Sequence, residues 1–413
     1  MSSTERSGLL RNLTEEVRTL LNNLPSVPDD QRVLELIEDY ILHDNRTCGL
    51  RHQEKKSLMD RIFLSTRKDL DLLQPVIEDH TVSEIMVNGL EGIYIEREGK
   101  MERVERRFQS REDLEEVIRR IAAKIHREIN ELHPILDARL EDGSRVSAVY
   151  RNVAINGPVL TIRRFPEHRI NMEELIDRQT ITREAAEFLQ KLVIAGYNIF
   201  ISGGTSSGKT TFLNVLSNYI PKEERVVVIE DSAELQLDEI ENLVRLETRI
   251  ANVQDKGEVT IKQLIRASLR MRPDRIIVGE VRGGEVLDMI QAMNTGHDGS
   301  LSTGHGNSTE SMLHRLEAMF LTAASFPMDA IRQQIASAID IMIHLGRLSD
   351  KSRKVLEISE VAGYQDGRIL LNPLYQYRFH SEADQSGSRN GRLISTGNPL
   401  IHHTKLDWKG LML

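Results

Sequence analysis

The sequence of 413 residues is poor in cysteine, in aromatic residues and in long apolar runs. Its single cysteine, Cys48, excludes a disulfide within the chain and any cysteine-rich metal site. Aromatic residues make up 4% of the chain, which disfavours a surface on which nucleic-acid bases stack. No run approaches the roughly 18 apolar residues that a membrane-spanning helix needs.

Positive charge is also in short supply, with 54 lysines and arginines against 63 acidic residues and a net charge of −9. Proteins that bind nucleic acid usually carry a basic excess, so we expect no nucleic acid as the main partner. The first 24 residues contain Glu5, Glu15 and Glu16 and lack the basic-then-apolar layout of a signal peptide. We therefore expect a cytoplasmic protein, and its length predicts two or three domains of about 150 residues each.

The strongest motif runs from Gly203 to Thr210 and has the pattern G-x-x-x-x-G-K-T. An apolar run typical of a buried strand precedes it and a helical pattern follows, which is the context of a phosphate-binding loop. Backbone N–H groups of such a loop face phosphate oxygens, and the positive end of the helix dipole adds to them. Lys209 is predicted to reach the β- and γ-phosphates of ATP, and the Thr210 hydroxyl to hold Mg²⁺. The predicted nucleotide-binding residues are Gly203, Gly204, Thr205, Ser206, Ser207, Gly208, Lys209, Thr210 and Thr211.

Two acidic segments follow apolar runs that read as strands. Glu230 begins the segment Glu-Asp-Ser-Ala-Glu directly after the run 226–229, and Glu280 follows the run 276–278 and a glycine. Ligands bind at the carboxyl ends of parallel strands, where one carboxylate can orient water and another can hold Mg²⁺ through its water shell. A helix cap made by Asp231 is the structural alternative for the first segment.

Two histidines, His297 and His305, each follow Thr-Gly. A histidine near the γ-phosphate can sense it, whereas a zinc site would need further ligands that are not spaced nearby. An arginine cluster at Arg270, Arg272 and Arg275 serves either a subunit interface or ion pairs with acids.

The remaining patterns predict an α/β architecture with four regions: helical residues 1–70, a small α+β domain at 71–165, a polar linker at 166–180, and a nucleotide-binding domain with a C-terminal appendage at 181–413. In the last region strands and helices alternate, which predicts a mostly parallel sheet covered on both faces. Helical patterns lie at 5–24, 33–41, 58–64, 111–127, 182–193, 260–271, 285–293, 308–322 and 328–339. Strand-like runs lie at 84–87, 93–96, 147–150, 159–163, 197–202, 226–229, 276–278 and 341–343, with a hairpin at 355–361 and 368–377.

From about residue 70 to 365 the chain resembles the type II/type IV secretion ATPase superfamily and, more narrowly, the assembly ATPase of Flp/Tad-type pili. The segments that carry this resemblance are 84–89, 137–145, 203–211, 229–237, 269–283 and 294–300. The histidine segment departs from the family in having glycine, at Gly304 and Gly306, where alanine is expected beside the histidine.

The resemblance implies a RecA-like P-loop domain preceded by a PAS-like α+β domain and a helical segment. It implies ATP and Mg²⁺ as cofactors, Glu230 as the catalytic glutamate, Glu280 in place of the usual Walker B aspartate, and His305 in the histidine box. Arg145 and Arg163 of the small domain would reach the nucleotide. It further implies a homohexameric ring on the cytoplasmic face of the membrane that drives pilus assembly or secretion through an integral inner-membrane platform protein. A nucleic-acid translocase and a nucleotide-binding regulator without motor activity are the alternatives.

Overall fold

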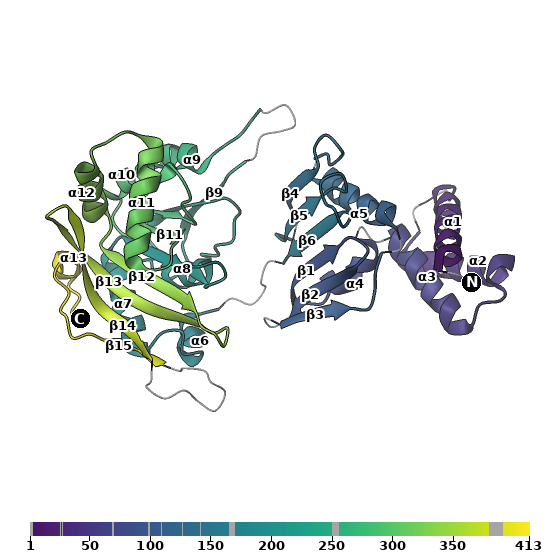
Figure 1. Cartoon of the computed structure of the whole chain (residues 1–413), viewed down its shortest axis with the longest axis horizontal. Helices are drawn as coiled ribbons and strands as arrows, with labels where there is room; N and C mark the ends of the chain where they lie inside the picture. Colours follow the sequence, from purple (N-terminus) through teal and green to yellow (C-terminus); the bar gives the residue numbers. More distant parts are fainter. Residues whose placement is uncertain are drawn as a thin grey trace. The chain divides into compact units, whose positions relative to one another are not determined.

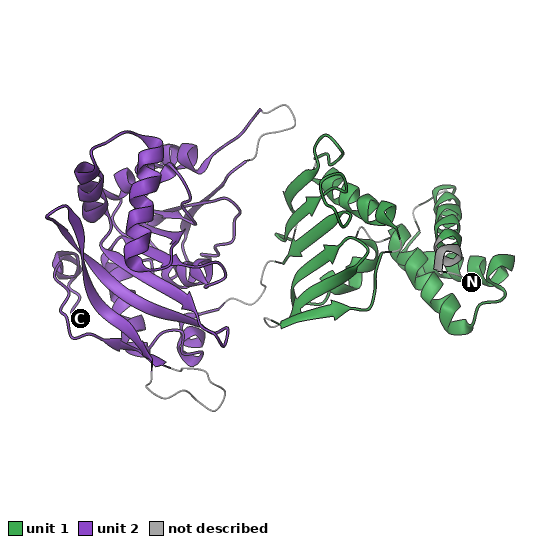
Figure 2. Cartoon of the chain, viewed as in Figure 1, with its two compact units in different colours: residues 1–168 green, residues 169–413 purple. Residues whose placement is uncertain are grey.

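The structure is a computed structural model. It describes the whole chain except residues 1–2, 25, 27, 68–69, 98–99, 109, 126, 141, 165–169, 250–255 and 380–390, so that the first part of the expected linker lies outside the described residues. The chain divides into two compact units, residues 1–168 and residues 169–413 (Figure 2). Residues 1–70, expected to form a domain of their own, fall within the first unit. The described residues hold no helix both long and apolar enough to span a bilayer.

The first unit begins with three helices, α1 (Ser3–Asn22), α2 (Asp30–His43) and α3 (His52–Arg67), as the apolar spacing predicted. Their buried side chains form a small core of Leu13, Val17, Val33, Ile37, Ile41 and Ile62. The short helical turn η1 (Asn45–Thr47) joins α2 to α3, and η2 (Asp71–Leu73) and α4 (Gln74–Ile77) follow α3 and lead into the sheet.

A six-stranded antiparallel sheet completes the first unit, with α5 (Arg111–Lys124) packed on it (Figure 1). Its strand order is β3-β2-β1-β6-β5-β4. The strands are β1 (Val82–Asn88), β2 (Gly92–Arg97), β3 (Lys100–Val104), β4 (Ile135–Arg139), β5 (Arg145–Val149) and β6 (Val159–Arg163). Strands β1, β2, β5 and β6 were predicted, whereas β3 and β4 were missed because their charged residues hide any alternation.

The second unit is built on a nine-stranded sheet with the order β15-β14-β13-β12-β7-β11-β10-β8-β9. The six strands from β12 to β9 pair in parallel, and β13, β14 and β15 extend the sheet antiparallel. The strands are β7 (Ile199–Gly203), β8 (Arg225–Glu230), β9 (Asn242–Glu247), β10 (Arg275–Val278), β11 (Leu301–His305), β12 (Ile341–Arg347), β13 (Arg353–Gln365), β14 (Arg368–Phe379) and β15 (Gly391–Ser395).

Helices cover both faces of this sheet, as the alternation predicted (Figure 1). One apolar core lies under α6 (Met172–Asp177), α7 (Arg183–Ala195), α8 (Lys209–Ser217) and α13 (Thr404–Lys409). The other lies under α9 (Ile261–Ser268), α10 (Glu285–Met293), α11 (Thr309–Ala323) and α12 (Met328–Ala338). A capping box between Thr260 and Gln263 begins α9, within the helical pattern predicted at 260–271.

Two segments are more ordered than their polar composition indicated. The stretch predicted to be a linker holds α6, whose Met172 and Leu175 are buried in the core of the second unit. The C-terminal appendage adds β15 and α13, and its Leu393 and Leu406 join the same core. Each segment has only a few apolar residues, and those named here are buried although Trp408 of α13 is exposed, so composition alone misjudged both segments.

Arg275, from the predicted arginine cluster, is a structural residue at the start of β10. It is 2% exposed, and its guanidinium pairs with Glu224 and donates to the Val193 carbonyl. A Cβ added to Gly299 would lie 2.6 Å from its Nη1, so the cavity around the guanidinium has no spare room. Of the two functions that the sequence left open for this residue, the ion pair with an acid is the one present.

We predict that Arg275→Met lowers the free energy of unfolding by about 3 kcal/mol, because it leaves Glu224 and two carbonyls without their partner. Urea unfolding of the full chain measures this change. The matched control is Arg270→Met, at an exposed position of the same cluster, which we expect to change the unfolding free energy by less than about 0.5 kcal/mol. Equal effects of the two substitutions would contradict the role given to Arg275.

Candidate functional site

The predicted phosphate loop joins the carboxyl end of β7 to the first turn of α8. The chain turns sharply here, with φ of +58° at Ser206 and +94° at Gly208. A Cβ added to Gly203 would lie 2.6 Å from the Leu345 carbonyl oxygen, so only glycine fits there. Gly204, Thr205 and Ser206 are exposed, Ser207 is buried, and Thr210 and Thr211 are half-buried at the start of α8.

Lys209 is the first residue of α8 and is only 7% exposed. Its Nζ donates to the carbonyls of Gly203 at 3.1 Å and Gly204 at 3.0 Å. Burial lowers the pKa of Lys209, and the nearby Glu280 carboxylate opposes this shift. Neutral carbonyls solvate the ammonium group without cancelling its charge, so the loop offers a phosphate an uncompensated cation.

A chain of polar contacts connects this lysine to both predicted acidic segments. Lys209 Nζ lies 3.2 Å from Nδ1 of His305, whose Nε2 lies 2.9 Å from Oε1 of Glu280. Arg282 then pairs with Oε2 of Glu280 at 2.9 Å and with Oδ2 of Asp231 at 3.2 Å. The contacts thus link the ends of β7, β11, β10 and β8, which the sheet places side by side.

His305 occupies the centre of this chain. An ammonium group can only donate, so Nδ1 of His305 accepts from Lys209 and the ring proton lies on Nε2, the nitrogen 2.9 Å from Oε1 of Glu280, although the geometry forms no hydrogen bond to that oxygen. Partial burial and the charge of Lys209 lower the pKa of His305, whereas Glu280 raises it. The neutral imidazole therefore separates the lysine from the carboxylate and contacts both.

Glu230 ends β8 and is almost completely buried. Its Oε1 accepts the backbone N–H groups of Glu234 at 2.9 Å and Leu235 at 3.0 Å. Burial raises the pKa of Glu230 against the effect of these two hydrogen bonds. A Cβ added to Gly279 would lie 3.1 Å from Cγ of Glu230, so the glycine before Glu280 makes room for the other acid.

The two predicted Mg²⁺ residues, Thr210 and Glu280, offer a hydroxyl and a carboxylate, the oxygen donors that Mg²⁺ prefers. Both oxygens of Glu280 already have cationic or imidazole neighbours, so the carboxylate suits an outer position behind water. Among the described residues, no group of three or more His, Cys, Asp and Glu side chains could hold a metal ion unaided.

The two predicted histidines do not share a site. His305 ends β11 beside the loop, whereas His297 precedes β11 and its Nδ1 contacts the Ala292 carbonyl at the C-terminal end of α10. The five-residue strand places them at opposite edges of the sheet. The glycines beside His305 are explained by packing, since a Cβ at Gly304 would lie 2.9 Å from a methyl group of Met312.

Arg145 and Arg163 belong to the first unit. They are register partners on β5 and β6, so they lie next to each other in its antiparallel sheet. The structure therefore brings these two arginines together.

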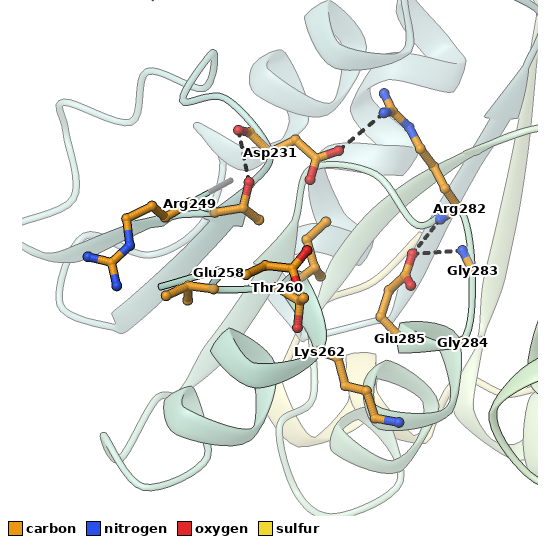
Figure 3. Close-up of a pocket in the computed structure, with 12 residues that line it drawn as sticks. Asp231, Arg249, Glu258, Thr260, Lys262, Arg282, Gly283, Gly284 and Glu285 are labelled. Carbon is orange, nitrogen blue, oxygen red and sulfur yellow. Dashed lines mark hydrogen bonds and ion pairs between the residues drawn. The ribbon is translucent and has the colours of Figure 1, made fainter. Parts of the chain in front are cut away.

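Arg282, to which sequence analysis gave no role, also borders a hollow of about 540 Å³ (Figure 3). The wall opposite Arg282 is formed by residues 258–262 at the start of α9. Glu285 also lines the hollow, and its Oε1 accepts the backbone N–H groups of Arg282 and Gly283. The hollow is therefore lined by Arg282, the residue that pairs with Glu280.

A glycine-rich loop between a buried strand and a helix, with carboxylates at the ends of the neighbouring parallel strands, defines a P-loop nucleotide-hydrolysing enzyme of the RecA-like class. A model of the Type II/IV secretion system protein family matches residues 66–395, and the chain belongs to this family. Members of this family hydrolyse ATP.

Two relatives agree with this placement, and one solved structure shares the fold. The chain is 34% identical over 299 residues to the conjugal transfer protein TrbB of Rhizobium radiobacter, covering 72% of this chain and 88% of that protein. It is 33% identical over 326 residues to the type IV secretion system protein PtlH of Bordetella pertussis, covering 72% and 94%. The ATPase DotB of Legionella pneumophila shares the fold, with a TM-score of 0.50 at 22% identity over 69% of this chain and 78% of that one.

We predict that the pKa of the His305 ring, measured by NMR titration of the nucleotide-free full chain, lies below 6.5. Glu280→Gln removes a negative charge and should lower this pKa further, whereas Lys209→Ala removes a positive charge and should raise it. The signal is assigned by its loss in His305→Gln. Shifts of the same sign in the two variants would show that the chain of contacts is absent in solution.

Proposed function

We propose that this chain is an ATP-driven motor of the type II/IV secretion class, and more narrowly the assembly ATPase of a Flp/Tad-type pilus. The observation that carries the proposal is the continuous contact from Lys209 through His305 to Glu280 and Arg282. A site that only binds a nucleotide needs no such connection between the phosphate loop and strand-end acids. The connection gives the loop a path to residues that act on water and Mg²⁺.

Each residue then has a role in hydrolysis. ATP places its phosphates on the loop, and Lys209 exchanges the Gly203 and Gly204 carbonyls for phosphate oxygens. Thr210 would hold Mg²⁺ together with the phosphates, and Glu280 would hold it through water, so that the cation would offset the negative charge of the phosphates. Glu230, whose pKa is raised by burial, orients the attacking water and accepts its proton. His305 senses the γ-phosphate, because it loses its contact with Lys209 when the phosphate draws the lysine away.

A hollow of about 270 Å³ beside the loop suits the nucleoside part of ATP. Ser207, Gly208 and Thr211 line it on one side, and Ile170 and Leu175 line it on the other. Ligand pockets commonly combine an apolar wall with a few polar groups of this kind.

Motor action needs a group that reaches the nucleotide from outside the second unit. Arg145 and Arg163 are our candidates, because two adjacent guanidinium groups can stabilise the charge that develops on the γ-phosphate. We propose that they act within a homohexamer on the cytoplasmic face of the membrane. Hydrolysis would then move the first unit against the second and pass the motion to an integral inner-membrane platform protein.

We predict that Lys209→Ala lowers ATP turnover by on the order of 100-fold or more, because it removes the cation that the loop offers to phosphate. The control is Lys222→Ala, which removes an exposed lysine that pairs with Glu239 and should leave turnover unchanged. ATPase assays of the full chain with and without the platform protein make the measurement. Near-normal turnover in Lys209→Ala would contradict the assignment, and negligible wild-type turnover with the platform protein present would favour a regulator without motor activity.

A nucleic-acid translocase is the second candidate, and the relative named as a conjugal transfer protein favours it. The net charge of −9 and the aromatic content of 4% oppose it. We therefore predict that single-stranded DNA leaves the ATPase rate unchanged. A several-fold stimulation that disappears steeply between about 50 and 200 mM salt would establish the translocase instead.

A further inference from the structure

The hairpin formed by β12 and β13 touches the phosphate loop from outside. β12 pairs in parallel with β7, with Leu345 opposite Gly203, and β13 returns antiparallel beside it. Arg353, the first residue of β13, donates from Nε to the Ser206 carbonyl at 3.1 Å. Its stem also packs on the loop, since a Cβ added to Gly208 would lie 3.3 Å from Cδ of Arg353.

The hydrogen bond from Arg353 is made to Ser206, the residue of the loop that has a side chain and a positive φ. Ser206 has φ of +58°, which places a side-chain-bearing residue in the left-handed region that glycine prefers. Such a conformation persists where neighbouring contacts hold it. The contact from Arg353 fixes the carbonyl of this peptide from the hairpin side.

Fixing that carbonyl also fixes the N–H group of the next residue. In a trans peptide the carbonyl of Ser206 and the N–H of Ser207 point in opposite directions. The carbonyl faces Arg353, and the Ser207 N–H faces into the loop, where it donates weakly to the Gly204 carbonyl at 3.4 Å. Lys209 also donates to that carbonyl, at 3.0 Å. The Ser207 N–H and the Lys209 ammonium group therefore share the Gly204 carbonyl as acceptor. A bound phosphate would take its place as the acceptor of both donors.

We propose that Arg353 is a positioning residue for nucleotide binding, which holds the Ser206 peptide so that the Ser207 N–H faces the phosphates. This role rests on the proposed function of the loop as the ATP site. Arg353 acts through the loop backbone and touches no phosphate itself. It also borders the hollow of about 270 Å³ beside the loop, so the experiment must separate an effect on phosphates from an effect on the nucleoside.

The test compares Arg353→Met with Arg347→Met in the full chain, using calorimetric titration with ADP and with pyrophosphate. Methionine keeps an apolar stem against Gly208 and removes only the guanidinium, which favours folding of the variant. Arg347 is the register partner of Arg353 on the same hairpin and is exposed, so it controls for charge and for hairpin stability. We expect Arg353→Met to weaken both ligands about tenfold and Arg347→Met to weaken neither.

A double-mutant cycle with Ser206→Gly gives a readout that a merely structural role would not produce. Glycine adopts a positive φ without support, so Arg353→Met should cost much less affinity, about threefold or less, when residue 206 is glycine. Melting temperatures measured on the same samples should agree within a few degrees.

Three results would overturn the proposal. They are unchanged affinity for both ligands in Arg353→Met, loss of ADP binding with pyrophosphate binding intact, and the same loss in Arg347→Met as in Arg353→Met. The second result would make Arg353 a nucleoside contact. If the wild-type chain binds neither ligand, the proposed function itself fails, and this outcome is distinct from the other three.

Discussion

A buried ammonium group without a carboxylate in direct contact governs this site. Among the described residues, Lys209 forms its hydrogen bonds with two carbonyls and an imidazole, and Glu280 contacts the other nitrogen of that imidazole. A buried cation held this way costs desolvation energy that neutral partners recover only in part, which is why burial lowers the pKa of Lys209. A phosphate can offset the rest of this desolvation energy. The loop therefore favours anions already in its nucleotide-free conformation. Because His305 lies between them, the Glu280 carboxylate is near Lys209 but does not pair with it directly.

The parallel sheet makes this arrangement possible. In the registers of β7, β11 and β10, His305 pairs with Gly203, and Ser302 pairs with Val278, so the histidine and the segment leading to Glu280 end at the same edge. Glu230 follows on β8, where Ile229 pairs with Val278. Glycines at the strand ends let these side chains crowd together, as the contact between Gly279 and Glu230 shows. Four strands that are distant in sequence thus deliver a lysine, a histidine and two acids to one edge.

The sequence predicted the parts of the site that consist of a short motif after an apolar run. The loop, Glu230 and Glu280 could be found in this way, because a buried parallel strand and the residue at its end are adjacent in sequence. Pairing across the sheet has no such local signal, so Arg282 and Arg353 were missed, and His297 was grouped with His305 although a strand separates them. Polar segments were misjudged for a related reason. In α6 and α13 a few apolar residues face a core that composition cannot reveal.

The antiparallel extension of the sheet is part of the site rather than an addition to it. Leu345 of β12 restricts Gly203 from one side, and Arg353 of β13 holds Ser206. Further along β13, buried Glu360 accepts the backbone N–H groups of Ile401 and His402, which fastens the C-terminal segment to the same strand. The phosphate loop is therefore held on the hairpin side by backbone contacts and on the β11 side by His305. The two sides restrain different atoms of the loop, so under the proposed function a phosphate that draws Lys209 away would break the contact with His305 and leave the hairpin contacts in place. The hairpin contacts would keep the loop in its phosphate-binding conformation while the contact between His305 and Glu280 changes. Nucleotide binding could then alter the surroundings of Glu280 without altering the backbone of the loop.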